Sequence, residues 1–334
     1  MNKDSRFGEL GLIITNSHPS LGQEVAAILK RKFPNIDSQI KSGPFPNKEL
    51  NVERICDVSG RDICIFSSLH SRYDTMEELR LLCDSIRGAS RIFGVFPFVK
   101  TGKSDHVKKF GEPVAYKNTA MLISSSGLSV IAIFDQHSAQ HPGFFDTTHY
   151  TLKTVHHLYL MRILIEYAKA HGDEIDGVLA LDDGGYKRNK KVAELLGKDV
   201  SFIIKDRDAT SKLVSIEKSR IVGNVAGQKV AAFDDMLQEG GTLEMGAKIA
   251  KHNGAKEVSF FVVHNDFSQN TYARINPLLQ DGTIDRIYTL GTLPMRPDEV
   301  WHKNLIVLSP AKLIAEVIFL IHTEGHMRGL FLEI

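Results

Sequence analysis

The residues best suited to chemistry follow an apolar run that ends at Phe233. Asp234 and Asp235 come directly after it, and the turn Gly240-Gly241-Thr242 leads into a helical pattern. Glycines let backbone N–H groups approach an anion closely, and a helix N-terminus favours negative charge. Two adjacent carboxylates can hold two neighbouring sugar hydroxyls. The pattern is typical of a sugar-phosphate site, and an acidic turn followed by a threonine helix cap would look the same.

Short apolar runs alternate with helical patterns along most of the chain. This alternation favours an α/β fold with largely parallel sheets. The expected strands are 10–15, 62–67, 91–98, 129–134, 177–181, 201–204, 229–233, 258–263 and 286–290. Helices are expected between most of them, including 18–29, 75–87, 242–252 and 311–322.

An internal repeat divides the chain into two similar halves. The run 63–68, with the helix and strand that follow it, resembles the run 230–235 and its successors, and Phe66 and Phe233 are 167 positions apart. We therefore expect two α/β domains with a boundary near Tyr150. The first copy has Ser67-Ser68 where the second has its acidic pair, so only the second is expected to hold the sugar-phosphate site.

Composition excludes several classes of protein. The 334 residues include 41 Lys and Arg against 40 Asp and Glu, and this balance argues against a protein that coats nucleic acid or acidic membranes. Cys56, Cys64 and Cys83 form no C-x-x-C pair and are expected to be reduced thiols. There is no leader-like N-terminus and no apolar run long enough for a membrane span. We expect a soluble cytoplasmic protein.

Six motifs occur in the order found in the ribose-phosphate diphosphokinase (phosphoribosyl diphosphate synthetase) family, which the chain resembles over most of its length. The motifs lie at 45–52, 76–90, 135–146, 181–188, 205–207 and 321–326. The resemblance implies an α/β fold of two tandem phosphoribosyltransferase-like domains, each a mainly parallel sheet flanked by helices. The expected parts are a degenerate N-terminal domain (8–150), a sugar-binding domain (151–310) and a C-terminal helix and tail that pack on the first domain (311–334).

The resemblance also implies a reaction and residues to perform it. The family transfers the diphosphoryl group of Mg²⁺-ATP to the 1-hydroxyl of ribose 5-phosphate, leaves AMP and supplies nucleotide biosynthesis. The residues matched to ribose 5-phosphate are Asp234, Asp235, Gln238, Glu239, Gly240, Gly241 and Thr242. Lys205 and Arg207 match the catalytic cations, at the start of a segment (205–212) expected to be mobile until nucleotide binds. A solvated loop is the alternative for that segment.

Metal and nucleotide residues follow from the same resemblance. His137 and Asp182 match the Mg²⁺ ligands, with Asp135 and Asp146 as weaker candidates, and a hydrogen-bonded core histidine is the alternative for His137. The residues matched to ATP are Phe45, Asn47, Glu49, Lys103, Ser104 and Asp105. In the family the first three contact adenine across a subunit interface, whereas a simple turn is the alternative. The resemblance thus implies a homo-oligomer, a dimer or a hexamer.

The chain departs from the common family pattern at a few site positions. Lys103 and Ser104 stand where Arg and Gln are usual, and Gln238-Glu239 replaces Asp-Thr. Gln238, together with Pro97-Phe98 before Thr101-Gly102 and with Asp182-Asp183-Gly184, resembles the plant-type class II branch, whereas Glu239 does not. This resemblance implies little activation by phosphate and a relaxed choice of nucleotide donor. Ser104, Asp206 and Glu239 leave a second hypothesis, a non-catalytic regulatory subunit of the same family. A phosphoribosyltransferase that consumes the product is a third hypothesis, disfavoured by the two-domain length.

Overall fold

The computed structural model describes residues 5–36, 40–55, 57–71, 74–171, 175–207 and 214–330. The chain forms two compact units. The N-terminal unit comprises 1–159, 292–294 and 309–331, and the C-terminal unit comprises 160–291, 295–308 and 332–334. The first unit therefore runs to Tyr159 rather than to residue 150, because the strand at 154–158 completes its sheet.

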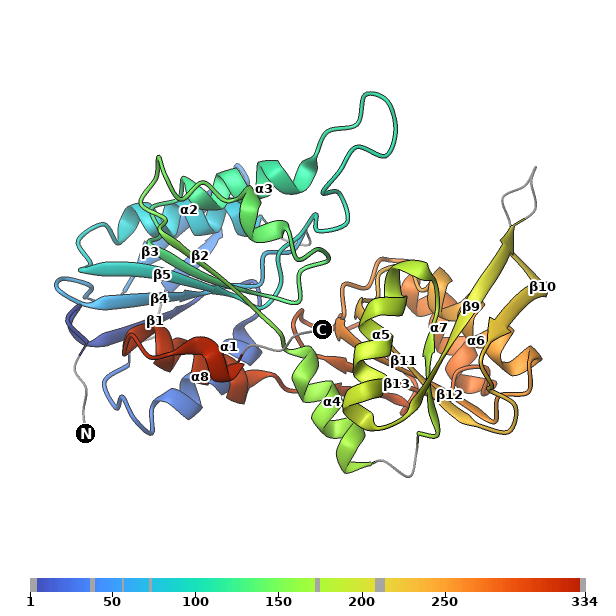
Figure 1. The fold of residues 1–334 in the computed structure, drawn as a ribbon. Helices are drawn as coiled ribbons and strands as arrows, with labels where there is room; N and C mark the ends of the chain where they lie inside the picture. Colours follow the sequence, from blue (N-terminus) through green and yellow to red (C-terminus); the bar gives the residue numbers. More distant parts are fainter. Residues whose placement is uncertain are drawn as a thin grey trace. The chain divides into compact units, whose positions relative to one another are not determined.

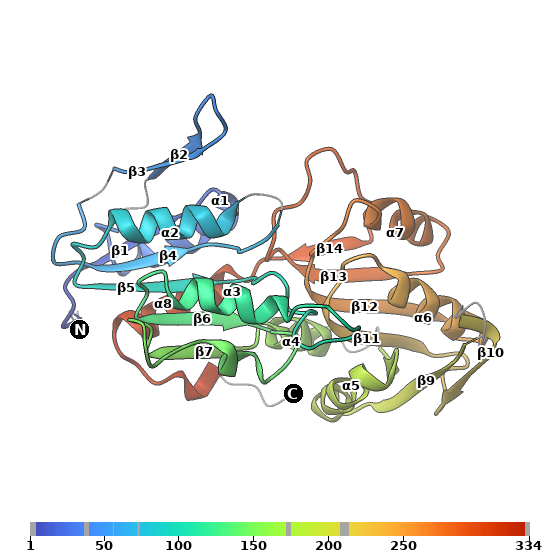
Figure 2. The same cartoon turned by 90° about the horizontal axis from the view of Figure 1, so that it is seen from above.

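The N-terminal unit is built on a five-stranded parallel sheet. The strand order is β1-β4-β5-β6-β7. The strands are β1 (Leu10–Ile14), β4 (Asp62–Phe66), β5 (Arg91–Phe96), β6 (Val130–Phe134) and β7 (Thr154–Leu158). Figure 1 shows α2 (Thr75–Ser85) and α3 (Ala115–Ser124) on one face, and α1 (Pro19–Leu29) and α8 (Ala311–His322) on the other. The antiparallel hairpin of β2 (Ile40–Pro44) and β3 (Leu50–Arg54) stands away from this sheet (Figure 2).

Both faces of the first sheet are buried, as expected for a parallel sheet covered by helices. All five residues of β1 and of β4 are buried. Ile63 and Ile65 belong to the core that includes α2 and α3. On the other face Gly22 of α1 lies so close to Ile14 that an added Cβ would be 2.3 Å from its Cγ2. The glycine therefore permits α1 to pack directly on β1.

A buried ion cluster fixes the end of α8 to the amino ends of the strands. Arg91 donates through Nε to Asp62 Oδ1 (2.8 Å) and through Nη2 to Asp62 Oδ2 (2.6 Å). His322 Nδ1 lies 2.8 Å from the same Oδ2, and Arg91 also donates to the carbonyl of Ile321 (3.0 Å). The carboxylate of Asp62 is completely buried, and the bonds to Arg91 and His322 offset the free-energy cost of removing its charge from water.

The C-terminal unit is built on a seven-stranded sheet in the order β10-β9-β8-β11-β12-β13-β14. Only the β9–β10 pair is antiparallel. The strands are β8 (Gly177–Ala180), β9 (Asp199–Arg207), β10 (Val214–Val222), β11 (Lys229–Met236), β12 (Glu257–His264), β13 (Arg286–Leu290) and β14 (Leu305–Leu308). Figures 1 and 2 place α4 (Met161–Ala170) and α5 (Asp183–Leu196) on one face, and α6 (Gly241–His252) and α7 (Thr271–Gln280) on the other.

Alternating side chains of the second sheet face the two helical layers. Phe233, Phe261 and Tyr288 stack in a row across three strands, with ring centroids 4.7 and 4.6 Å apart. Tyr167 of α4 packs on Tyr288 at 5.0 Å. Phe260, which directly precedes Phe261 on β12, belongs to the core that includes α6 and α7. This period of two is the pattern expected of strands that are buried on both sides.

The two units repeat one strand order, which confirms the predicted pair of similar domains. The order β8-β11-β12-β13-β14 in the second unit matches β1-β4-β5-β6-β7 in the first, so β11 corresponds to β4. At the end of β4, Ser67 and Ser68 are buried, and their hydrogen bonds include Thr15 Oγ1 to Ser67 Oγ (3.0 Å) and Ser68 N–H to Ser17 Oγ (2.8 Å). Buried hydroxyls thus stand where the second unit has its carboxylates.

A buried carboxyl group beneath the β2–β3 hairpin gives a prediction about stability. Glu78 of α2 is fully buried, and its Oε1 accepts the backbone N–H of Asn16 at 3.3 Å. Among the described residues its Oε2 has no hydrogen-bond partner. Burial raises the pKa of Glu78, and hydrogen bonds from Ser42 and Asn16 oppose that change. The folded protein therefore binds this proton more tightly than the unfolded chain does.

Glu78→Gln is expected to stabilise the protein at neutral pH by roughly 1 kcal/mol, because the amide keeps an acceptor oxygen and carries no charge. The native contribution of Glu78 is greatest below its unfolded pKa of about 4.3 and is lost as the pH rises toward the raised folded value. Urea unfolding at several pH values tests this: the variant and the wild type should converge at low pH and diverge above it. An equal difference at every pH would contradict the assignment to ionisation.

Candidate active site

Three neighbouring strands of the second sheet bring predicted site residues to one edge. Asp182 follows β8, Lys205 lies near the end of β9, and Asp234 and Asp235 lie near the end of β11. Because β9 and β11 both pair with β8 in parallel, these ends meet at the carboxyl edge of the sheet. Ligands of open α/β sheets bind at this edge. The sheet order therefore gathers residues that are spread from position 182 to position 235 in the sequence.

Arg188 of α5 bridges the acidic pair. Its Nη1 donates to Asp234 Oδ1 (2.5 Å) and its Nη2 donates to Asp235 Oδ1 (3.0 Å). Asn189 fixes this arrangement, because its side-chain amide bonds both the N–H (2.9 Å) and the C=O (2.9 Å) of Phe233. Burial and the neighbouring Asp235 raise the pKa of Asp234 to about 7, against the opposing charge of Arg188. One of the two carboxyl groups thus titrates near neutral pH.

The Gly-Gly-Thr turn leads directly into α6, as the sequence predicts. Gly240 has φ +80°, a left-handed conformation that glycine adopts without strain, and no side chain caps the N-terminus of this described helix. The first N–H groups of a helix lack intrahelical partners, so they can bind an anion. Thr242 is exposed at this N-terminus. The turn is therefore suited to phosphate.

An arginine from α7 stands beside the same turn. A Cβ added to Gly241 would lie 2.7 Å from Arg274 Nη1, so the glycine makes room for the guanidinium. Arg274 Nε is 3.6 Å from Glu244 Oε2. Gln238 donates to Asp266 Oδ2 (2.7 Å), and Glu239 is exposed to solvent. Because Glu239 is exposed, solvent screens its charge from the neighbouring turn.

Asp182 and Lys205 form an ion pair at the neighbouring strand ends. Lys205 Nζ lies 3.7 Å from Asp182 Oδ2, and the lysine side chain is 12% exposed. Asp182 also caps α5, because its Oδ1 accepts the N–H of Gly185 at 3.0 Å. The pair holds a lysine at the edge where the acidic pair and the turn lie. The side chain of Arg207 and residues 208–213 lie outside the described part of the chain.

The remaining metal candidates belong to the N-terminal unit. Asp135, which follows β6, is buried with φ +39°, and His137 is exposed. Asp146 accepts N–H groups from Thr148 (2.8 Å) and His149 (3.0 Å), and these bonds lower its pKa to about 2. They hold the Asp146 carboxylate against the backbone that directly follows it. Within the described ranges, no three His, Cys, Asp or Glu side chains gather as a metal-holding group.

The first set of predicted nucleotide residues lies at the tip of the β2–β3 hairpin. The Phe45 N–H donates to the Glu49 carbonyl (2.7 Å), and Asn47 Oδ1 accepts the Glu49 N–H (3.2 Å). Lys48 adopts φ +72° in this turn. Phe45 is 48% exposed. The tip is a tight turn that presents an aromatic ring to solvent.

The second nucleotide set lies in the loop between β5 and α3. Lys103 is half-buried and Ser104 is exposed. Asp105 bonds His106 Nδ1 through Oδ1 (2.6 Å) and His141 Nε2 through Oδ2 (3.2 Å). Burial alone would raise the pKa of Asp105, but the two histidines outweigh it and the pKa is lowered. Both carboxylate oxygens are therefore engaged within the unit itself.

Two site arginines were missed by sequence reasoning. Arg188 lies inside the motif at 181–188, yet only the fold shows that it pairs with Asp234 and Asp235. Arg274 lies in a helix with no motif, and its proximity to Gly241 depends on the packing of α7 beside α6. A basic residue one turn beyond Gly184-Gly185 could have signalled the first. No local pattern signals the second.

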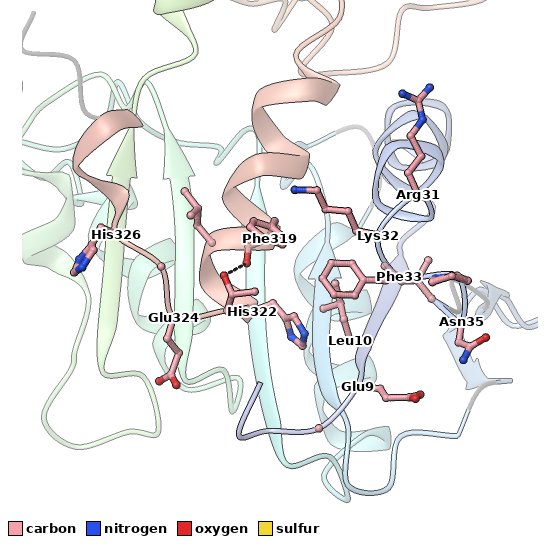
Figure 3. Close-up of a pocket in the computed structure, with 16 residues that line it drawn as sticks. Glu9, Leu10, Arg31, Lys32, Phe33, Asn35, Phe319, His322, Glu324 and His326 are labelled. Carbon is pink, nitrogen blue, oxygen red and sulfur yellow. Dashed lines mark hydrogen bonds between the residues drawn. The ribbon is translucent and has the colours of Figure 1, made fainter. Parts of the chain in front are cut away.

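The N-terminal unit also contains a pocket of about 820 Å³ at the opposite, amino edge of its sheet. Figure 3 shows that the pocket lies between the segment after α1 and the end of α8. Phe33 packs on Phe319 (6.1 Å between centroids) and on His322 (5.1 Å), and Lys32 Nζ lies 3.8 Å from the centroid of Phe319. None of the predicted site residues lines it. We therefore do not assign the catalytic chemistry to this pocket.

Comparisons with known proteins agree on one family. Residues 10–127 match the model of the N-terminal domain of ribose phosphate pyrophosphokinase, and residues 156–275 match that of the phosphoribosyl transferase domain. The chain is 30% identical to a ribose-phosphate pyrophosphokinase of Synechocystis sp., over 96% of this chain and 92% of that one. A relative of the same name from Clostridium acetobutylicum is 31% identical, over 95% of this chain and 96% of that one.

A solved structure gives the same result in three dimensions. The crystal structure of phosphoribosylpyrophosphate synthetase from Mycobacterium smegmatis matches with a TM-score of 0.82 and 27% identity, over 95% of this chain and 100% of that one. Both domains of the present chain are thus accounted for. Among the described helices, none combines the length and apolar character that a membrane span requires.

Proposed function

The chain belongs to the ribose-phosphate pyrophosphokinase family, and we propose that it transfers the diphosphoryl group of Mg²⁺-ATP to the 1-hydroxyl of ribose 5-phosphate. The products are phosphoribosyl diphosphate and AMP. One observation carries this proposal: the acidic pair, the uncapped glycine turn and a lysine meet at one carboxyl edge of the second sheet. Nothing in the described part of the chain or in the comparisons favours a non-catalytic role.

The sugar phosphate is assigned to Asp234, Asp235 and the turn that follows them. The carboxylates accept hydrogen bonds from two ring hydroxyls, and the N–H groups at the start of α6 bind the 5-phosphate. Arg188 neutralises part of the acidic charge, which lets the two carboxylates lie close together. The supported role of the C-terminal unit is therefore to hold the acceptor.

Lys205 and Arg207 are assigned to the transferred group. In the reaction the 1-hydroxyl oxygen forms a bond to the β-phosphorus, the bond from that phosphorus to the α,β-bridging oxygen breaks, and the hydroxyl proton is released. Negative charge on the phosphoryl oxygens must be stabilised while this happens. A lysine beside Asp182, at the same sheet edge as the acceptor site, suits this role.

The described donors fit Mg²⁺ at one position. Mg²⁺ prefers oxygen ligands and is commonly held by one or two carboxylates together with substrate phosphates. Asp182 supplies a half-exposed carboxylate next to Lys205. We assign the ion to Asp182. When bound, it would offset the charge of the triphosphate.

ATP is assigned to Lys103, Ser104 and the hairpin tip with Phe45, Asn47 and Glu49. An exposed ring at the end of a projecting hairpin can stack on a base, and this arrangement fits a base bound by a neighbouring copy. We therefore also propose a homo-oligomer, which light scattering of the purified protein would test. A relaxed choice of nucleotide donor, as the class II resemblance implies, stays a prediction.

The proposed reaction is tested by measuring AMP release from Mg²⁺-ATP with and without ribose 5-phosphate. Sugar-dependent AMP, formed in equal amount with phosphoribosyl diphosphate, is the expected result. Folded protein that forms no AMP at saturating substrates would overturn the proposal. AMP formed equally without the sugar would identify a nucleotide hydrolase instead.

A further inference from the structure

A buried network in the N-terminal unit joins two segments. One is the loop of Lys103, Ser104 and Asp105, called the ATP loop below, and the other is the segment that follows β6. His141 lies in the short 3₁₀ helix His141–Phe144, and its side chain is completely buried. Its Nε2 lies 3.2 Å from Asp105 Oδ2. An ionised carboxylate only accepts hydrogen bonds, so Nε2 carries the hydrogen. His141 therefore anchors the loop through Asp105.

The same histidine reaches the second segment through Tyr116. The two rings stack, with centroids 3.8 Å apart and planes inclined by 24°. Tyr116 is buried, and its hydroxyl donates to Gln136 Oε1 at 2.8 Å. Gln136 lies between the metal candidates Asp135 and His137. The network thus joins the loop of Lys103 to the segment of those candidates.

Backbone bonds reinforce this connection at both ends. The N–H of Tyr116 in the first turn of α3 donates to the carbonyl of Ser104 (3.0 Å). This bond ties the ATP loop to the start of α3. The N–H of Gln136 donates to Nε2 of His157 on β7 (3.1 Å), and its side-chain amide donates to the carbonyl of Phe134 (2.9 Å). Gln136 is therefore held in one orientation, with its Oε1 toward Tyr116.

We propose that His141 is a positioning residue that holds Asp105, and through it Lys103 and Ser104, in the geometry that binds ATP. Asp105 itself acts through the position of the loop, because both its oxygens are engaged by histidines. The inference rests on the proposed function, since it concerns the ATP site of the same reaction. The residues assigned to ribose 5-phosphate belong to the other unit, so we expect the affinity for that substrate not to depend on this network.

Kinetics of His141→Leu against His141→Gln test the proposal. Leucine keeps an apolar contact for Tyr116 but cannot donate to Asp105, whereas the glutamine amide can replace Nε2 as donor. His141→Leu should raise the KM for ATP about tenfold, with kcat within twofold and the KM for ribose 5-phosphate unchanged. His141→Gln should restore the KM for ATP to within threefold of the wild type.

His106→Ala is the matched control, because it removes the other bond to Asp105. That bond lies at an exposed ring, with 66% of the side chain accessible, so its loss should leave the KM for ATP within twofold. If His141→Leu fails to fold, Asp105→Asn takes its place in the experiment. The asparagine amide has only one oxygen, so it cannot accept hydrogen bonds from both histidines as the two carboxylate oxygens do. Calorimetric titration with a non-hydrolysable ATP analogue measures the same loss of ATP affinity without turnover.

Three results would overturn the proposal. The first is an unchanged KM for ATP in folded His141→Leu, and the second is an equal rise in the KM of both substrates. The third is a KM for ATP that glutamine does not restore. Failure of the proposed function has a different signature, because the wild type itself would then form no sugar-dependent AMP.

Discussion

Lys205→Ala is expected to reduce sugar-dependent AMP formation about 10³-fold at saturating substrates, the scale of losing one group that stabilises transition-state charge. Lys205 lies 3.7 Å from Asp182 at the edge that also holds the acidic pair. A lysine is a compact charge on a flexible stem, so it can follow the β-phosphoryl group from donor to acceptor. The loss should appear mainly in kcat, because the contact is strongest while the group is in transit.

Lys256→Ala controls for the loss of a positive charge. Lys256 is exposed just before β12, at the amino edge of the same sheet, and should retain full activity. Thermal unfolding of both variants separates a folding defect from a catalytic one. A folded Lys205→Ala protein that keeps its kcat would remove Lys205 from the reaction. Activity restored by Lys205→Arg would show that charge alone suffices.

The strand ends of the second domain were largely predictable from the sequence. An apolar run that stops at two carboxylates and resumes as a glycine turn and a helix identifies β11 and α6 with few residues of error. The repeat between 63–68 and 230–235 predicted corresponding strands, and the sheet order bears this out. Both inferences depend on local patterns, which is why they succeeded.

Other features depend on tertiary packing and could not be predicted locally. The run 154–158 contains two histidines and is only partly buried, yet it pairs with β6 and closes the first sheet. The interaction of Arg188 with Asp234 and Asp235 requires α5 to cross the strand ends. Asp105 was matched to ATP together with its neighbours Lys103 and Ser104, whereas its partner His141 lies 36 positions away in a different element.

The titration of Asp234 gives the second large expected effect. Its pKa of about 7, which burial and Asp235 raise, means that near neutral pH this group is only partly ionised. An ionised carboxylate accepts hydrogen bonds from sugar hydroxyls, whereas a protonated one offers a competing donor. kcat/KM for ribose 5-phosphate should therefore rise with pH and level off above about 7. The KM for ATP should not share this step.

Asp234→Asn is expected to lower kcat/KM for ribose 5-phosphate about 10²-fold at pH 8, since a hydrogen bond to a charged group contributes about 1.5–3 kcal/mol. The variant should also lose the step near pH 7. The sugar phosphate ionises with a second pKa of about 6, and any step from that group should persist in both proteins. Glu257→Gln, at the amino edge of the sheet, should keep the wild-type profile. A step near 7 that survives in Asp234→Asn would assign the titration to a different group.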